Sequence, residues 1–189
     1  ALGGTAMAMF ADKNVATNKA VTVTGYTLSG DDGGNYNLIQ PAALSADISK
    51  ASLAVIGLNA IHKVYDGVLN AYLAGIAKVD ALGADNVTLA GAGSAVFAEK
   101  NVALNKTVAV AGYRLTGADG NNYTLVQPLG LTANISKADL NVFGVVANNK
   151  TYDTNRGAVL GGTAAVSAIG TDSVALSGSG SGLFEDKNV

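Results

Sequence analysis

A six-residue phrase occurs three times at equal spacing, and this spacing is the strongest constraint on how the chain can fold. FADKNV begins at Phe10, FAEKNV at Phe97 and FEDKNV at Phe184, so the interval is 87 residues both times. Aligned at this interval without gaps, residues 10–56 and 97–143 are identical at about three positions in five. The unit is longer than the roughly 20–50 residues of a solenoid repeat, so each copy is long enough for a small domain with its own core.

The repeat divides the sequence into three copies of different completeness. We expect residues 1–49 to be the C-terminal part of one copy, residues 50–136 a complete copy, and residues 137–189 the N-terminal part of the next. We interpret the sequence as a window on a longer array. Because the two partial copies are complementary, the alternative is that chains complete one another head to tail through an open, non-closing contact.

The composition excludes several classes of partner. Apolar residues make up 49% of the chain but are mostly Ala, Val and Leu, and the longest apolar runs are too short and interrupted to span a bilayer. The net charge of −2 gives no field that would attract nucleic acid or an anionic membrane. The absence of cysteine excludes a disulfide framework and a thiolate metal site.

Strand patterns dominate the chain. Residues 19–27 and 106–113 alternate Val with Thr or Ala, which is the period of a half-buried strand. Asn35–Ile39 and Asn122–Val126 are predicted as short strands that follow Gly- and Asp-rich turns. Further short strands are predicted at the following pairs of equivalent positions: 87–89 and 174–176, and 96–97 and 183–184.

One segment favours a helix in one copy only. Asn70–Leu82 is the best helix candidate, but its equivalent contains three glycines, each of which would weaken a helix by about 1 kcal/mol. We therefore predict a mainly β fold, with antiparallel β-sandwich-like modules of about 87 residues in an elongated rod. A β-grasp-like α+β module is the alternative if Asn70–Leu82 is helical.

The junction between copies shows a change of strand parity. Leu131, Ala133 and Ile135 alternate on one parity, and Leu140 and Val142 alternate on the other. Since successive side chains of a strand point to opposite faces, a continuous strand over residues 131–142 can leave one core and enter the next. Four lysines are predicted to protect exposed sheet edges: Lys19, Lys63, Lys106 and Lys150.

Several phrases of the central copy together resemble a known family. They are KVYDG from Lys63, DNVTL from Asp85, FAEKNV from Phe97, LTG from Leu115, NYTL from Asn122 and ISK from Ile135. This set resembles the YDG-type repeat, a relative of the MBG-type repeats of large bacterial surface proteins such as filamentous-haemagglutinin-like adhesins. The signature residues are Tyr65, Asp66, Phe97, Lys100, Asn101, Gly112, Tyr113, Asn122 and Tyr123. The third copy has Thr154 after Tyr-Asp, so this sequence does not require the glycine.

The Lys-Asn pair in the repeated phrase suggests two roles. Beside Asp12, Glu99 and Asp186, it fits an intramolecular Lys–Asn isopeptide bond assisted by a carboxylate. Such a bond needs the two side chains to meet across strands inside a core, whereas neighbours on one strand face opposite ways. A polar turn after the strand, with Phe10, Phe97 and Phe184 as core anchors, is the favoured interpretation.

Other candidate sites give weaker signals. Asp31–Asn35 and Asp119–Asn122 carry oxygen ligands suited to Ca²⁺, but a hairpin turn is favoured because the second copy keeps one carboxylate. The Gly-Ser-rich segments 91–94 and 178–182 lack the Lys-Ser/Thr and the following helix of a phosphate loop. His62 becomes Asn149 in the next copy, so we expect an isolated, exposed imidazole.

The recurring tyrosines also allow two interpretations. The set comprises Tyr26, Tyr36 and Tyr65 with their equivalents Tyr113, Tyr123 and Tyr152. An exposed aromatic face would bind glycans, and Tyr26 and Tyr113 on one exposed face would support this. More often such rings pack in the core and the hydroxyl forms hydrogen bonds at its edge, which is the favoured interpretation.

The resemblance implies an extracellular stalk or adhesive array, located on the bacterial cell surface or secreted, with no enzymatic activity. We therefore expect a structural and adhesive region with no catalytic residues, no cofactor and no metal. The expected partners are neighbouring repeats of the same chain, with other copies in a fibre or a surface glycan as further candidates. Nucleic acid and membrane insertion are not expected. A glycan-binding module and a head-to-tail polymerising subunit are the alternatives.

Overall fold

The structure is a computed structural model that describes residues 1–188. The third copy of the repeated phrase is therefore described up to Asn188, because Val189 lies outside the described residues. The chain divides into two compact units. The first comprises residues 1–59, 73–95 and 109–131, and the second comprises residues 60–72, 96–108 and those from Thr132 onward.

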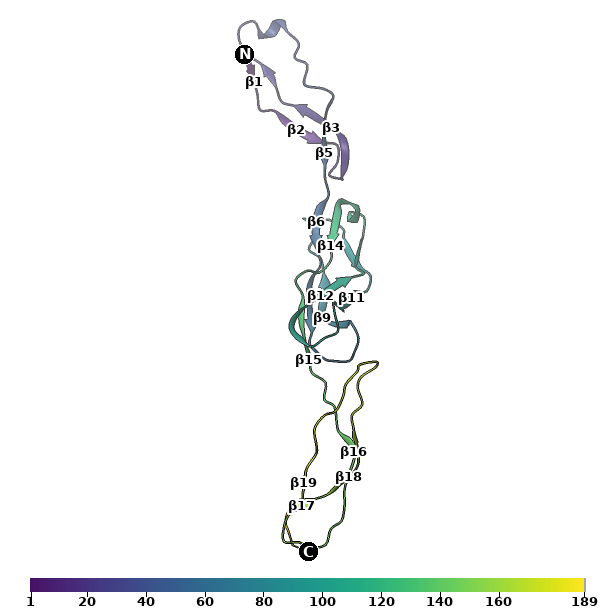
Figure 1. The fold of residues 1–189 in the computed structure, drawn as a ribbon. Helices are drawn as coiled ribbons and strands as arrows, with labels where there is room; N and C mark the ends of the chain where they lie inside the picture. The colour runs from purple at the N-terminus through teal and green to yellow at the C-terminus, as the bar shows by residue number, and fades with distance from the viewer. Residues whose placement is uncertain (189) are drawn as a thin grey trace. The chain divides into compact units, whose positions relative to one another are not determined.

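The protein is mainly β, as the sequence predicts, with no α-helix among residues 1–188. In the first unit β2, β3 and β5 lie side by side as an antiparallel sheet, and β6 and β14 form a parallel pair (Figure 1). Two further antiparallel pairs are β1 with β4 and β10 with β13. Their bounds are β1 (Leu2–Gly3), β2 (Met7–Phe10), β3 (Ala16–Thr24), β4 (Thr27–Leu28), β5 (Leu44–Ile48), β6 (Ala51–Ala54), β10 (Thr88–Ala90), β13 (Arg114–Thr116) and β14 (Tyr123–Val126). Two short 3-10 helices form the predicted Gly-Asp turns, η1 (Gly33–Asn35) and η2 (Gly120–Asn122).

In the second unit β16 lies beside β18, and β17 beside β19, both antiparallel (Figure 1). β15 pairs in parallel with β8. The bounds are β8 (Lys63–Val64), β15 (Thr132–Ser136), β16 (Phe143–Ala147), β17 (Gly157–Ala158), β18 (Leu160–Ala165) and β19 (Gly182–Leu183).

The largest sheet has the order β7-β9-β11-β12-β15-β8 and includes β7 (Ile56–Ile61), β9 (Asn70–Lys78), β11 (Ser94–Phe97) and β12 (Ala103–Ala111).

The two longest Val-rich strands confirm the period-2 prediction and share a bulge. In β12, Val108 and Val110 are buried and their neighbours are exposed. The register of β12 against β15 shifts beside Asn105, which has a left-handed φ of 52° and donates its N–H to the Asn134 side chain at 2.8 Å. Asn18 does the same in β3, with Asp47 as acceptor. Asparagine tolerates this conformation, so one residue type produces the bulge at both equivalent positions.

Facing glycines form a second repeated feature. In the first unit Gly57 and Gly75 both have positive φ, and a Cβ on Gly75 would lie 2.1 Å from the Gly57 carbonyl oxygen. Positive φ and this close backbone approach both require glycine. The facing pairs are Gly4 with Gly25, Gly57 with Gly75, Gly91 with Gly112, and Gly144 with Gly162. The third pair is equivalent to the first after a shift of 87 residues, and the fourth is equivalent to the second. The Gly-Ser-rich segment 91–94 thus takes part in a tight backbone contact through Gly91.

The buried core belongs almost entirely to the central copy. In the first unit the buried apolar residues are Val23, Leu53, Val55, Ala95, Val110 and Tyr123, and in the second they are Phe97, Val108, Ala133 and Ile135. Phe97 is only 1% exposed, whereas Phe10 and Phe184 are 38% and 36% exposed. The prediction that all three phenylalanines anchor a core is therefore correct for Phe97 alone.

Two predicted strands are not formed. Tyr123–Val126 is a strand because it pairs with β6, but residues 36–39 have no paired strand in the described part of the chain. Likewise β10 forms against β13, and residues 174–176 remain irregular. Strand formation at these positions depends on the partner strand and not on the local residues.

Two longer predictions are also corrected. Residues 70–78 of the helix candidate form β9, in which Ala71 and Leu73 alternate with exposed neighbours, so the β-grasp-like alternative is wrong. The strand predicted over residues 131–142 ends at Ser136, and the chain is irregular until Phe143. Leu140 and Val142 are exposed there, because no strand covers them as β14 covers the equivalent Leu53.

Candidate functional site

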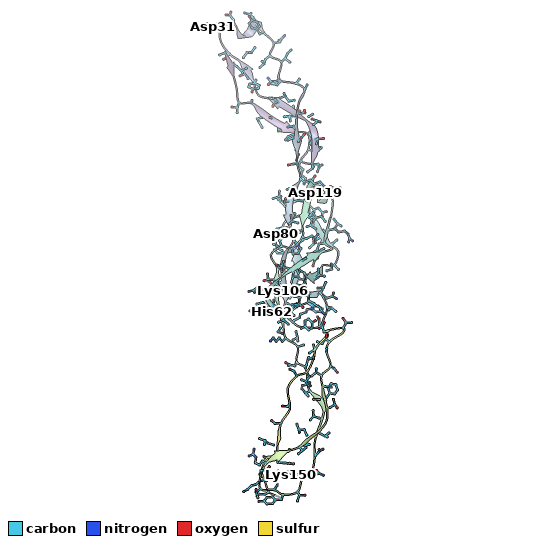
Figure 2. All side chains as sticks on the ribbon, viewed as in Figure 1. Asp31, His62, Asp80, Lys106, Asp119 and Lys150 are labelled. Carbon is cyan, nitrogen blue, oxygen red and sulfur yellow. The ribbon has the colours of Figure 1, made fainter. Side chains whose placement is uncertain are left out.

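The Tyr-Asp-Gly phrase surrounds a nearly buried lysine. The Lys63 side chain is 6% exposed and its Nζ donates to Asp66 Oδ1 at 2.7 Å and to two backbone carbonyls, at 2.7 and 2.9 Å. The same Nζ lies 5.4 Å from the centre of the Phe97 ring. A buried ammonium needs such partners, since an unpaired charge is costly to remove from water. Lys150, labelled in Figure 2, repeats the arrangement with Asp153 and Phe184.

The lysines predicted to protect sheet edges therefore have another role. Lys19 and Lys106 are also nearly buried, and they pair with Asp12 and Glu99 of the repeated phrase. Their ammonium groups lower the pKa of these carboxyl groups, and Lys63 lowers that of Asp66. The acidic position of the phrase is thus a structural partner of a lysine within the same copy.

The first Lys–Asp cluster, defined as Lys13, Asp85, Asp119 and Tyr123, lies in the first unit. Lys13 forms ion pairs with Asp85 Oδ1 and, at 2.9 Å, with Asp119 Oδ1. The Tyr123 hydroxyl donates to Asp85 Oδ2 at 2.7 Å and accepts from the Leu82 N–H at 3.1 Å. Asp119, labelled in Figure 2, accepts from the Asn86 N–H at 2.8 Å. One ammonium thus connects two carboxylates that would otherwise repel each other.

Two asparagines extend this cluster. The Asn122 side chain accepts a hydrogen bond from the Val15 N–H at 2.9 Å. Its Nδ2 donates to Asn14 Oδ1 at 3.1 Å. The Lys-Asn pair of the first copy therefore contacts two segments of the central copy, and both of its side chains take part.

The second Lys–Asp cluster, defined as Lys100, Asp172 and Tyr65, lies in the second unit. Lys100 forms an ion pair with Asp172 Oδ1, and the Tyr65 hydroxyl donates to Asp172 Oδ2. The Lys100 ammonium also lies 5.8 Å from the centre of the Tyr65 ring.

The ion pair is the same in both clusters. Lys13 and Asp85 are 72 residues apart, as are Lys100 and Asp172. Each aspartate also donates its N–H to the carbonyl three residues earlier, at 3.1 Å in both. The repeated phrase is a polar turn, as predicted, since the Asn14 N–H donates to Asp12. The aspartate that its lysine binds in the following copy was not predicted, although Asp85 and Asp172 themselves recur after 87 residues.

A comparison with protein families places these contacts within a known domain family. The model of the YDG domain matches residues 1–44 and 49–130, about two thirds of the chain. The chain belongs to the YDG domain family. No curated protein matches it, and no solved structure does.

The remaining YDG signature residues hold the backbone in place. The Gln127 side chain accepts from the Tyr113 N–H at 3.3 Å and donates to the Tyr113 carbonyl at 2.8 Å, and Gln40 does the same for Tyr26. The Tyr113 ring lies against Gly93, where a Cβ would be 2.5 Å from it. Asn101 is exposed in the irregular segment between β11 and β12.

Other candidate residues of the YDG chain have ordinary roles. His62 is exposed as predicted but not isolated, because its Nδ1 accepts from the Asn134 N–H at 2.9 Å. The described residues contain no group of three or more His, Cys, Asp or Glu side chains placed to hold a metal ion. Within residues 1–188 no helix is long and apolar enough to cross a membrane.

The first cluster predicts a change with pH. The Lys13 ammonium and the Tyr123 hydroxyl hold the pKa of Asp85 below its ordinary value of 3.8. The folded pKa is depressed, so this stabilisation is present above about pH 4 and is lost as the pH falls through the lowered pKa. We expect the Asp85 carboxyl, followed by ¹³C NMR, to titrate at a higher pH in Lys13→Ala than in the wild type. Lys187→Ala, which removes the equivalent lysine of the third copy, should leave the midpoint unchanged; an unchanged midpoint in Lys13→Ala would contradict the cluster.

Proposed function

We propose that this YDG chain is a structural and adhesive segment, a stalk or fibre region without catalysis, of a secreted or cell-surface bacterial protein. The observation that carries the proposal is the ion pair from the repeated phrase to an aspartate in the following copy, which recurs 87 residues later. A contact of this kind limits the motion of one copy relative to the next. Nearly buried lysines and the buried core of the central copy fit the same role.

The glycan-binding alternative loses its main support. Exposure of Tyr26 and Tyr113 on one face would have supported it, but both are half-buried and their backbones are held by glutamines. Tyr123 is buried as well, and its hydroxyl is used by the first Lys–Asp cluster.

Spin labelling tests whether the cluster restricts motion. The sequence has no cysteine, so Thr22→Cys on β3 and Thr124→Cys on β14 place one label in each of two successive copies. We expect a narrow distance distribution by double electron–electron resonance, and a broader one when Lys13→Ala is added, because the ion pairs to Asp85 and Asp119 are lost. Lys187→Ala is the matched control. Equally broad distributions in the wild type and Lys13→Ala would remove the basis of the proposal.

Location is tested separately on intact cells that produce the protein. An epitope next to the YDG segment should be removed by added protease while a cytoplasmic marker persists. Protection of the epitope until the cells are lysed would overturn the assignment to the cell surface.

A further inference from the structure

Strands from the beginning and the end of the central copy run parallel and pair with each other. In the first unit β6 pairs with β14 (Figure 1), and in the second unit β8 pairs with β15. We propose that these two parallel pairs bear tension along the chain, because a pull on the chain loads their hydrogen bonds in shear. The inference rests on the proposed structural role and adds a mechanical function to it.

The parallel ladder of the first unit is loaded from opposite ends. It begins where Ala51 pairs with Tyr123 and continues to Ala54 and Val126. A hydrogen bond from the Val55 N–H to the Val126 carbonyl, at 3.0 Å, extends it. Because the strands are parallel, the N-terminal ends of β6 and β14 lie together. A pull on the N-terminal end of β6 and on the C-terminal end of β14 therefore acts in opposite directions along the ladder.

The parallel ladder of the second unit has the same geometry. Lys63 pairs with Ile135, and the offset of 72 residues is the same as in the first ladder. The Tyr65 N–H donates to the Ser136 carbonyl at 2.9 Å, just beyond the paired strands. The chain enters β8 at Lys63 and leaves β15 at Ser136, so tension again reaches opposite ends.

Such a ladder resists a pull differently in different directions. Its hydrogen bonds are evenly spaced and cross from strand to strand, so tension from opposite ends strains all of them at the same time. Tension on the same end of both strands instead breaks them one after another. Forced unfolding is governed by the barrier to unfolding, which is higher when several bonds must break together.

Buried side chains cover one face of each ladder. Leu53, Val55 and Tyr123 of the first ladder are between 4% and 6% exposed, and Ile135 of the second is 1% exposed. A hydrogen bond is electrostatically stronger away from water, and a broken one has no water at hand to replace its partner. The burial therefore strengthens the ladders against a pull.

The connection to the preceding copy delivers tension to the first ladder without slack. β5 ends at Ile48 and β6 begins at Ala51, so Ser49 and Lys50 alone separate the two strands. β5 is itself held in a sheet by β3. A pull on the preceding copy thus passes directly into the N-terminal end of β6.

The test pulls the full chain in two directions that differ in one handle. Since the sequence has no cysteine, Lys50→Cys can be combined with Leu129→Cys or with Asn121→Cys to attach handles for optical tweezers. All three side chains are exposed. Lys50 precedes β6, whereas Leu129 follows β14 and Asn121 precedes it. The Leu129 handle therefore shears the first ladder, and the Asn121 handle peels it open from one end.

We expect unfolding at the same constant force to be at least about tenfold slower with the Leu129 handle than with the Asn121 handle. A factor of ten corresponds to about 1.4 kcal/mol in the barrier, little more than the net contribution of one hydrogen bond. Circular dichroism of both double variants checks that they fold. Equal rates from the two handles, or faster unfolding from the Leu129 handle, would overturn the inference.

Adding Lys13→Ala separates this inference from the proposed function. Lys13 pairs with Asp85 and Asp119, and neither ladder contains any of these residues, so the dependence on direction should persist. Its loss would show that the first Lys–Asp cluster bears the load in place of the ladder, and would contradict the inference. The spin-label distances test the proposed function independently, because they are measured without load.

Discussion

Phe97→Ala is expected to lower the free energy of unfolding by roughly 3–5 kcal/mol. The Phe97 ring is 1% exposed and is, with Ile135, one of the two largest fully buried side chains among residues 1–188. Its removal leaves a cavity beneath Lys63, whose ammonium lies over the ring, and weakens the surroundings of a charge held away from water. Urea denaturation followed by circular dichroism measures the loss.

The chain contains its own control for this substitution. Phe184 lies in the same repeated phrase but is 36% exposed, although Lys150 lies over its ring as Lys63 lies over Phe97. Phe184→Ala should cost less than about 1.5 kcal/mol, because much of this ring is already in water. Equal losses for the two substitutions would show that the central copy does not hold the main core.

Gly75→Ala should cost about 2–5 kcal/mol. Gly75 has a φ of 98°, and an alanine Cβ would lie 2.1 Å from the Gly57 carbonyl oxygen. The positive φ costs an L-residue about 1–2 kcal/mol, and overpacking adds about 1–3 kcal/mol. The backbone oxygen cannot move away as the end of a flexible side chain would, so the strands β7 and β9 must separate locally. Urea denaturation again measures the effect.

Gly34→Ala is the matched control for the glycine pair. Gly34 does not have positive φ, and no atom lies within 4 Å of the Cβ that would be added. The free energy of unfolding should change by less than about 0.5 kcal/mol. If Gly75→Ala were as mild as Gly34→Ala, the close approach of β7 and β9 would be wrong.

Local patterns were sufficient to predict the strands whose partner is near in sequence. The Val alternation in β3 and β12 matches the buried positions, and the Gly-Asp segments form turns as expected, each with a short 3-10 helix. Burial was not predictable in this way. Phe10, Phe97 and Phe184 lie in nearly identical phrases, yet only Phe97 is buried, because the segments that cover it come from elsewhere in the chain. Residues 36–39 do not form the predicted strand for a similar reason, because no partner strand lies beside them in the described part of the chain.

The sequence predicted several residues of the candidate site but not the aspartates that they contact. The signature residues Tyr65, Lys100 and Tyr123 all take part in the two clusters. Their shared aspartates were not recognised, since nothing within a few residues of a Lys-Asn pair indicates an acid 72 positions later. The facing glycines are a similar case. Each of them resembles an ordinary turn glycine, and only the strand pairing shows that two of them meet.

The constant separation of each lysine from its aspartate has a genetic consequence. Because the aspartate lies 72 residues after the lysine and both recur after 87, removing or duplicating any 87 consecutive residues rejoins equivalent positions. Where an equivalent unit still follows, the lysine of the repeated phrase then keeps an aspartate 72 residues ahead, wherever within the unit the crossover falls. Unequal recombination between copies of such a gene can therefore change the length of the product in whole units and preserve each of these contacts.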